Sequence, residues 1–297
     1  TPFAMARSAV LWRTVGLAVL LAAAHCSDDA APRGAKVVPT CPTGILASVR
    51  QALNPWQVRL ERPRPPRGWQ GDVVVVFHGS GGPDRYTAQL LERVRSMDRW
   101  QRLTPRVVHL VDWSARSRNF LTAAFWSQRT GRAAADMLRD LGPLRNVHVV
   151  GISVGAFAAD ACAVALKAEG ASPAPYVRVT FLDPFTLRGL LGFGYGRRHF
   201  GRAADFALQV LNTDDPVPST NSPLPRCLCY DVTPAKEAFG LGPGYNGHDW
   251  PVDFLGRRYR NHAPRWPLQS DADAPRHGEG RPRGRVETIS TTSTYVY

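Results

Sequence analysis

The stretch Val147-His148-Val149-Val150-Gly151-Ile152-Ser153-Val154-Gly155 decides the fold of this chain. It begins as a run of strand-forming residues, passes through a Gly-x-Ser-x-Gly turn and continues into an alanine-rich helical pattern up to Glu169. A serine in such a strand-to-helix turn is raised above the sheet, and glycines are needed because side chains at 151 and 155 would collide with neighbouring backbone. This context predicts that Ser153 is a nucleophile; the alternative is an ordinary serine in a tight turn.

Apolar runs alternate with helical patterns on both sides of this stretch. The run 71–77 is apolar without polar alternation, which is typical of a strand buried on both faces, and further strands are predicted at 107–113, 177–182 and 206–211. Helical spacing covers 84–103 and 120–141. Strands separated by helices predict an α/β fold with a mostly parallel central sheet and helices on both faces. Ligands of such sheets bind beyond the carboxyl ends of the strands.

A glycine-rich loop, His78-Gly79-Ser80-Gly81-Gly82, follows the first predicted strand. Glycines let the backbone approach a substrate closely, so this loop suits an oxyanion hole. We predict the backbone N–H groups of Val154 and Ser80 as the two donors, with Gly79 close behind Ser80 and also lining the substrate site. A phosphate-binding loop is the alternative, but the Lys-Ser/Thr ending is missing. His78 is predicted to be structural.

A serine nucleophile needs a base and an acid that orients the base. Asp183 follows the strand 177–182 and Asp215 follows the strand 206–211, so both are placed suitably for the acid. For the base we favour His248, in the loop before a predicted closing helix, over the remaining candidates, which are His199, His262 and His277.

Four segments resemble the lipase family of α/β-hydrolases, of the pancreatic-lipase and lipoprotein-lipase type. They are 77–79, 111–114, 147–156 and 182–184, in family order. The resemblance implies an α/β-hydrolase fold and carboxylic ester hydrolysis through an acyl-serine, and it favours Asp183 over Asp215 as the acid. The chain departs from the family in having Ile152 before the serine. It also shows no cysteine-bracketed lid and leaves too little sequence for a C-terminal β-sandwich.

The segment 185–200 mixes aromatic and aliphatic residues with glycines. We expect it, with Leu190 and Leu191, to form an acyl-binding wall or mobile flap; the alternative is packing against the core. Other acyl-transfer enzymes (thioesterase, peptidase or acyltransferase) and a non-catalytic lipid-binding protein on the same scaffold stay open as alternatives. No metal or cofactor is expected.

The composition and the ends of the chain bear on partners and location. The 297 residues carry a formal net charge of +13, and only three of the 37 basic residues are lysines. Because no nucleic-acid-binding motif accompanies this charge, no nucleic-acid partner is expected. Residues 1–25 predict an export signal region and 26–40 a polar linker. The chain is therefore expected to be secreted, periplasmic or lipid-anchored, the last through Cys26.

The remaining boundaries are 41–268 for the catalytic domain and 269–297 for an Arg/Pro/Gly-rich tail, expected to be disordered and suited to an anionic surface such as acidic lipid. Among the cysteines, Cys162 is expected to be a small buried residue. Cys227 and Cys229 are too close for an easy mutual bridge, so either is a candidate to pair with Cys41, and the connectivity stays open.

Overall fold

The computed structural model describes residues 58, 60–101, 105–168, 174–189, 192–241, 247–261 and 282–289. All of them belong to one compact unit that begins at Val58. The predicted export signal, the linker and the boundary at residue 41 lie outside the described residues, as do Cys26, Cys41, Leu190 and Leu191.

A seven-stranded, fully parallel sheet forms the centre of this unit. Its spatial order is β2-β1-β3-β4-β5-β6-β7. The strands are β1 (Asp72–Phe77), β2 (Val107–Val111), β3 (Asn146–Ile152), β4 (Tyr176–Leu182), β5 (Phe206–Leu211), β6 (Leu228–Asp231) and β7 (Val286–Thr288). Because all strands are parallel, their carboxyl ends lie along one edge of the sheet, where the sequence analysis expects the site.

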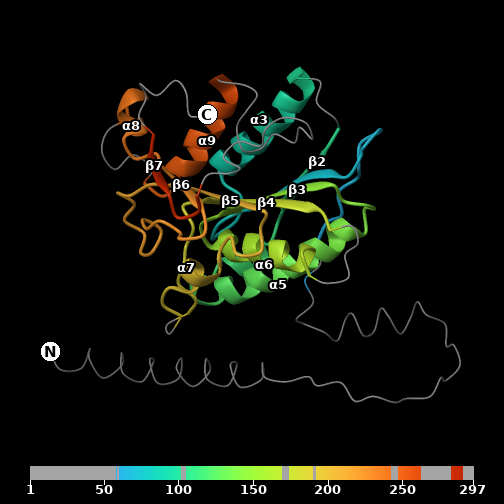
Figure 1. The fold of residues 1–297 in the computed structure, drawn as a ribbon, viewed down its shortest axis with the longest axis horizontal. Coiled ribbons are helices and arrows are strands. Elements are labelled where there is room, and N and C mark those ends of the chain that lie inside the picture. The colour runs from blue at the N-terminus through green and yellow to red at the C-terminus, as the bar shows by residue number, and fades with distance from the viewer. Residues whose placement is uncertain are drawn as a thin grey trace, which may run out of the picture. The chain divides into compact units, whose positions relative to one another are not determined.

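Helices cover both faces of the sheet, as Figure 1 shows. On one face lie α3 (Arg85–Gln101), α8 (Ala235–Ala238) and α9 (Trp250–Asn261). On the other lie α5 (Phe120–Arg139), α6 (Ala156–Leu166) and α7 (Tyr195–His199). The short helix α4 (Ser114–Ser117) follows β2, and the 3-10 turn η1 (Ser153–Gly155) joins β3 to α6. The predicted α/β sheet with helices on both faces is therefore confirmed.

Strand β1 shows why its sequence is apolar throughout. Val73, Val75 and Phe77 point into the core shared with α5 and α6, while Val74 and Val76 point into the core shared with α3 and α9. Successive side chains of a strand alternate between the two faces of the sheet, so a strand covered on both sides needs an apolar residue at every position.

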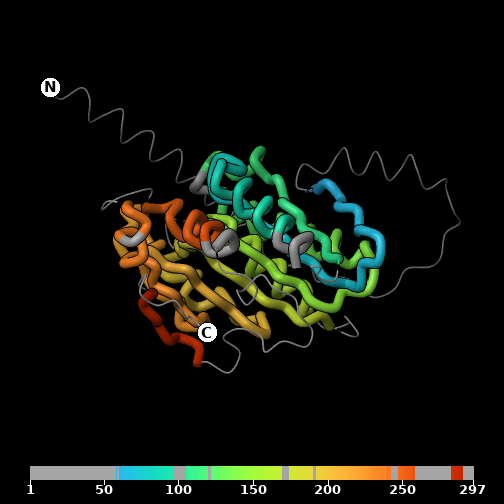
Figure 2. Tube along the Cα trace, turned by 90° about the horizontal axis from the view of Figure 1, so that it is seen from above, coloured from blue at the N-terminus to red at the C-terminus, as the bar shows by residue number. Residues whose placement is uncertain are grey.

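The end of the sheet differs from the expectation. The tail from residue 269 was expected to be disordered, but Val286–Thr288 form β7 and pair with β6, and Ile289 is buried. In Figure 2 this segment, in red, lies at the edge of the molecule. The guanidinium of Arg283 donates to the carbonyl oxygens of Gly201 and Ala204, both at 2.7 Å. A strand of three residues is too short to show a periodic apolar pattern in the sequence. It is stabilised by pairing with the existing edge of the sheet.

Two further findings concern cysteines and membranes. Cys162 is buried, as expected, and among the described residues Cys227 and Cys229 are buried and free, while the predicted partner Cys41 lies outside those residues. Among the described residues, no helix combines the length and the apolar character that crossing a bilayer requires.

A close contact between α5 and α6 yields a prediction about stability. A Cβ added to Gly131 would lie 2.1 Å from the carbonyl oxygen of Ala158, so Gly131→Ala must push the two helices apart. We expect a loss of about 1–3 kcal/mol in the free energy of unfolding, measured by urea denaturation. Arg132→Ala, on the exposed side of the same helix, is the matched control. Equal stability of the two variants would contradict this packing.

Candidate active site

The turn at Ser153 has the geometry of a nucleophile elbow. Ser153 directly follows β3 and has a φ of 52°, in the left-handed region that non-glycine residues rarely adopt. A Cβ at Gly155 would lie 2.5 Å from the carbonyl oxygen of Phe77, and one at Gly151 would lie 2.8 Å from the Cα of Ala156. The collisions expected at both glycines are thus confirmed. Strain of this kind persists where the surrounding structure holds it, as it does at many functional sites.

His248 lies against this serine. Its Nε2 is 2.7 Å from the Oγ of Ser153, although 95 residues separate the two in sequence. His248 lies two residues before the start of α9, so the packing of α9 and α3 over the sheet sets its position. Of the rival histidines, His199 lies on α7, and His262 and His277 lie outside the described residues.

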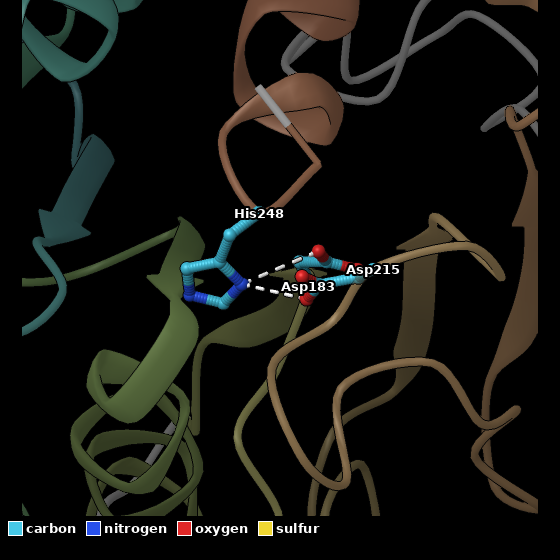
Figure 3. Close-up of side chains that lie close together, drawn as sticks. All are labelled: Asp183, Asp215 and His248. Atoms are coloured by element: carbon cyan, nitrogen blue, oxygen red, sulfur yellow. Dashed lines mark hydrogen bonds and ion pairs between the residues drawn. The ribbon is translucent and has the colours of Figure 1, made fainter. Parts of the chain in front are cut away.

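Both candidate acids meet at the other ring nitrogen of His248. Nδ1 is 2.8 Å from Oδ2 of Asp215 and 3.4 Å from Oδ2 of Asp183. Figure 3 shows the two carboxyl groups on the same side of the imidazole, facing one nitrogen. Because β4 and β5 are parallel neighbours, the residues that follow them lie close together. The structure therefore brings together two residues that the sequence analysis treated as alternatives, with Asp215 closer to the histidine.

Asp215 is well supplied with hydrogen-bond donors. The backbone N–H of Val217 donates to its Oδ1 at 3.0 Å, and the Thr220 hydroxyl donates to its Oδ2. Burial alone would raise the pKa of this carboxyl, but the hydrogen bonds from His248, Thr220 and Val217, together with the nearby Asp183 carboxyl group, hold the pKa well below its ordinary value. Asp215 is therefore ionised at neutral pH.

Asp183 has a poorer environment. Its Oδ1 accepts the backbone N–H of Asn212 at 3.2 Å, while its Oδ2 is buried with no hydrogen-bond partner among the described residues. Burial, opposed by His248 and reinforced by Asp215, raises the pKa of this carboxyl to about 8. Two neighbouring carboxyl groups thus have pKa values displaced in opposite directions.

The charge around His248 affects its basicity. Burial alone would lower the pKa of the imidazole, but Asp183 and Asp215 outweigh this effect and raise the pKa to about 9. The ligand atoms of these three side chains lie within 4.8 Å of one another, a spacing that a metal ion could bridge. Nδ1, however, donates its hydrogen to Oδ2 of Asp215, so this nitrogen has no free lone pair for a metal ion.

The glycine-rich loop after β1 approaches the serine. A Cβ at Gly79 would lie 3.3 Å from the Cβ of Ser153, so the loop backbone is in contact range of the nucleophile. The Ser80 hydroxyl donates to the carbonyl oxygen of Ser117 at 2.8 Å, which ties the loop to α4. Val154, the second predicted donor, lies in η1 directly after Ser153.

His78 holds this loop rather than facing the serine. Its Nε2 accepts the backbone N–H of Trp113 at 3.1 Å, which assigns the ring hydrogen to Nδ1, and Nδ1 lies 2.8 Å from the Gly79 carbonyl oxygen. Burial lowers the pKa of His78, so the ring is neutral. Its contacts agree with the structural role expected from the sequence.

Asn212 is a site residue that the sequence analysis missed. It is buried at the end of β5; its backbone N–H bonds Asp183, and its side-chain amide donates to the carbonyl oxygen of Gly247, next to His248. Thr220 was missed as well. No motif marks either residue, although the position of Asn212 directly after a predicted strand is a usable signal.

The segment 185–200 is tied to the nucleophile turn at its start. The backbone N–H of Phe185 donates to the carbonyl oxygen of Ser153 at 3.1 Å. At its end Phe200 is fully buried, whereas Phe193, between the two, is 70% exposed. Phe185 and Phe200 therefore pack against the core, as the alternative for this segment predicts.

Comparison with known proteins adds a distant likeness. No family model and no curated protein matches the sequence. Among solved structures, a ferulic-acid-bound protein from Butyrivibrio proteoclasticus has 13% identity and a TM-score of 0.40, over 68% of this chain and 91% of that one. An esterase from Pyrobaculum calidifontis has 16% identity and a TM-score of 0.36, over 72% and 88%. A cutinase-like protein from Cryptococcus sp. has 15% identity and a TM-score of 0.35, over 66% and 96%.

The parallel sheet, the strained serine turn and the helices on both faces define the α/β-hydrolase fold. The identities and TM-scores are too low to transfer an activity from the similar structures. The more specific resemblance to the pancreatic-lipase type stays a prediction.

Proposed function

We propose that this chain is a serine hydrolase that cleaves carboxylic esters through an acyl-serine intermediate. The proposal rests above all on one observation: the Ser153 hydroxyl lies 2.7 Å from Nε2 of His248, whose Nδ1 faces a buried carboxylate at 2.8 Å. A nucleophile, a base and an oriented carboxylate in this arrangement are what acyl transfer requires.

In the proposed reaction, Oγ of Ser153 attacks the ester carbonyl carbon while Nε2 of His248 takes the hydroxyl proton. The negative charge that develops on the carbonyl oxygen is stabilised by the backbone N–H groups of Val154 and of Ser80 or Gly79. His248 then returns the proton to the departing alcohol. A water molecule releases the acid in a second cycle with the same base.

We assign the orienting carboxylate to Asp215 rather than to Asp183, which the family resemblance favours. Asp215 has the shorter distance to Nδ1 and a pKa low enough to stay ionised throughout the reaction. An ionised partner fixes the tautomer of the base and stabilises the imidazolium that forms.

For the substrate we propose an ester with an apolar acyl group, bound beneath the segment 185–200. A Cβ at Gly189 would lie 3.4 Å from the ring of Phe125, which is itself 46% exposed, so an aromatic side chain borders this segment at Gly189. Leu190→Ser with Leu191→Ser should weaken long-chain esters more than short ones. Equal losses for all chain lengths would contradict this role.

Export and attachment to an anionic surface remain part of the proposal. Arg198, Arg202 and Arg226 are exposed and all act electrostatically on His199, so they gather in one region of the surface. Such a cluster favours an acidic partner such as an anionic lipid surface.

The main test compares hydrolysis of nitrophenyl esters from butyrate to palmitate by the wild type and by Ser153→Ala. Loss of the nucleophile is expected to lower kcat by about 10⁶-fold. Ser96→Ala, at a serine whose hydroxyl bonds Glu92 on the surface of α3, is the matched control and should keep full activity. Undiminished hydrolysis by Ser153→Ala would exclude this mechanism.

The charge around His248 predicts the pH dependence. Only the neutral imidazole can take the serine proton, and the carboxyl groups favour the charged form over the opposing effect of burial. The acid limb of kcat/KM should therefore lie above the ordinary pKa of histidine, with activity rising as the pH rises through it. His199→Gln, on α7, should leave the limb in place. A limb at or below 6.5 would contradict the electrostatic picture of the site.

A further inference from the structure

We propose that Asp183 is a positioning residue that carries a proton on Oδ2 and donates it in a hydrogen bond to Asp215, so that a single negative charge faces His248 in the reactive enzyme. The inference rests on the proposed function and deepens it, because it gives the second carboxyl group a distinct role.

The first argument is a count of hydrogens. Nδ1 of His248 carries one hydrogen, and Oδ2 of Asp215 at 2.8 Å is its acceptor. Oδ2 of Asp183 is therefore left without a donor, although the Asp183 side chain is only 1% exposed. A buried carboxylate oxygen without a donor is costly, whereas a buried carboxylic acid needs an acceptor, and Asp215 supplies one.

The second argument is a count of charges. Among the described residues, His248 is the basic side chain that acts on Asp183, and Asp215 is its acidic neighbour. Farther out, Asp249 follows His248 and interacts electrostatically with Asp84 and Arg85. Asp214 forms an ion pair with Lys236. Two ionised carboxylates would thus share one imidazole. Like charges this close cannot both persist, so one carboxyl group holds a proton.

The surroundings decide which carboxyl group is protonated. In the described part of the chain, Asp215 accepts hydrogen bonds from His248, Thr220 and the Val217 N–H, whereas Asp183 accepts one, from the Asn212 N–H. The carboxylate with more donors is the more stable anion. The upward displacement of the Asp183 pKa by burial agrees with this assignment.

The backbone also singles out Asp183. Its φ of 45° lies in the left-handed region. Among the described non-glycine residues, Ser153 and Ser219 also have a positive φ. The Ser219 hydroxyl accepts the N–H of Thr186, so the loop that carries Asp215 is tied to the segment that follows Asp183. The surrounding structure therefore holds Asp183 in a strained backbone conformation, as is common for residues of functional sites.

The variant Asp183→Asn tests the proposal. An amide reproduces the protonated carboxyl, since Oδ1 can accept the Asn212 N–H and Nδ2 can donate to Asp215. We expect kcat/KM within about tenfold of the wild type and an unmoved acid limb in its pH profile. Asp183→Ala, which offers no hydrogen bond, should lose more activity than Asp183→Asn. The mirror variant Asp215→Asn should lose about 10⁴-fold in kcat.

The opposite outcome has a distinct signature. If Asp183 is ionised in the reactive enzyme, Asp183→Asn removes a negative charge from His248. The acid limb then moves down by about one pH unit or more, and activity falls about as far as in Asp215→Asn. Either of these results would overturn the proposal.

A second measurement does not depend on ester hydrolysis. We would follow the His248 imidazole by NMR titration in Ser153→Ala, with and without Asp183→Asn. Equal midpoints support a neutral Asp183, and a lower midpoint with Asn overturns it. An enzyme without ester activity but with equal midpoints would reject the proposed function while leaving the assignment of the proton intact.

A third measurement covers the case in which Asp183→Asn does not fold. The wild type labelled with ¹³C at the aspartate carboxyl carbons then reports directly on Asp183. A shift typical of the protonated acid at a pH just above the acid limb, where His248 is neutral, supports the proposal, and a shift typical of the carboxylate overturns it.

Discussion

The left-handed turn at Ser153 is the constraint on which the rest of the structure depends. A non-glycine residue at this φ is costly, so the contacts on both sides must hold it. Gly155 lies against the carbonyl oxygens of Phe77 and His78, and Gly151 lies against α6. The helix α6 is held in turn by its close contact with α5 at Gly131. The reactive hydroxyl thus gains its position from the packing of β1, β3, α5 and α6 together.

The site joins the two hydrophobic cores of the molecule. Ser153 leads into α6, which packs on one face of the sheet, while His248 leads into α9, which packs on the other. The 2.7 Å contact between their side chains therefore requires both layers to be in place. Asn212 strengthens this link, because it bonds both Asp183 and the residue before His248. Such a site forms only in the fully folded protein, since no local segment contains it.

The parallel order of β4 and β5 explains the unusual pair of carboxyl groups. Asp183 directly follows β4 and Asp215 lies in the loop after β5, and these adjacent parallel strands bring both carboxyl groups to the same nitrogen of His248. Their different hydrogen-bond environments then displace their pKa values in opposite directions. A pair of titratable groups separated in this way is a common basis for dividing roles within an active site.

The sequence by itself determined the strands β1 to β5, the helices α3, α5 and α6 and the turn at Ser153, because each depends on apolar runs, helical spacing or glycines within a short segment. Only the tertiary structure decided how Asp183 and Asp215 share His248, how Asn212 links them, and that residues 286–288 add a strand. Those features arise from the pairing of strands and from hydrogen bonds between residues distant in sequence, and no local pattern records such contacts.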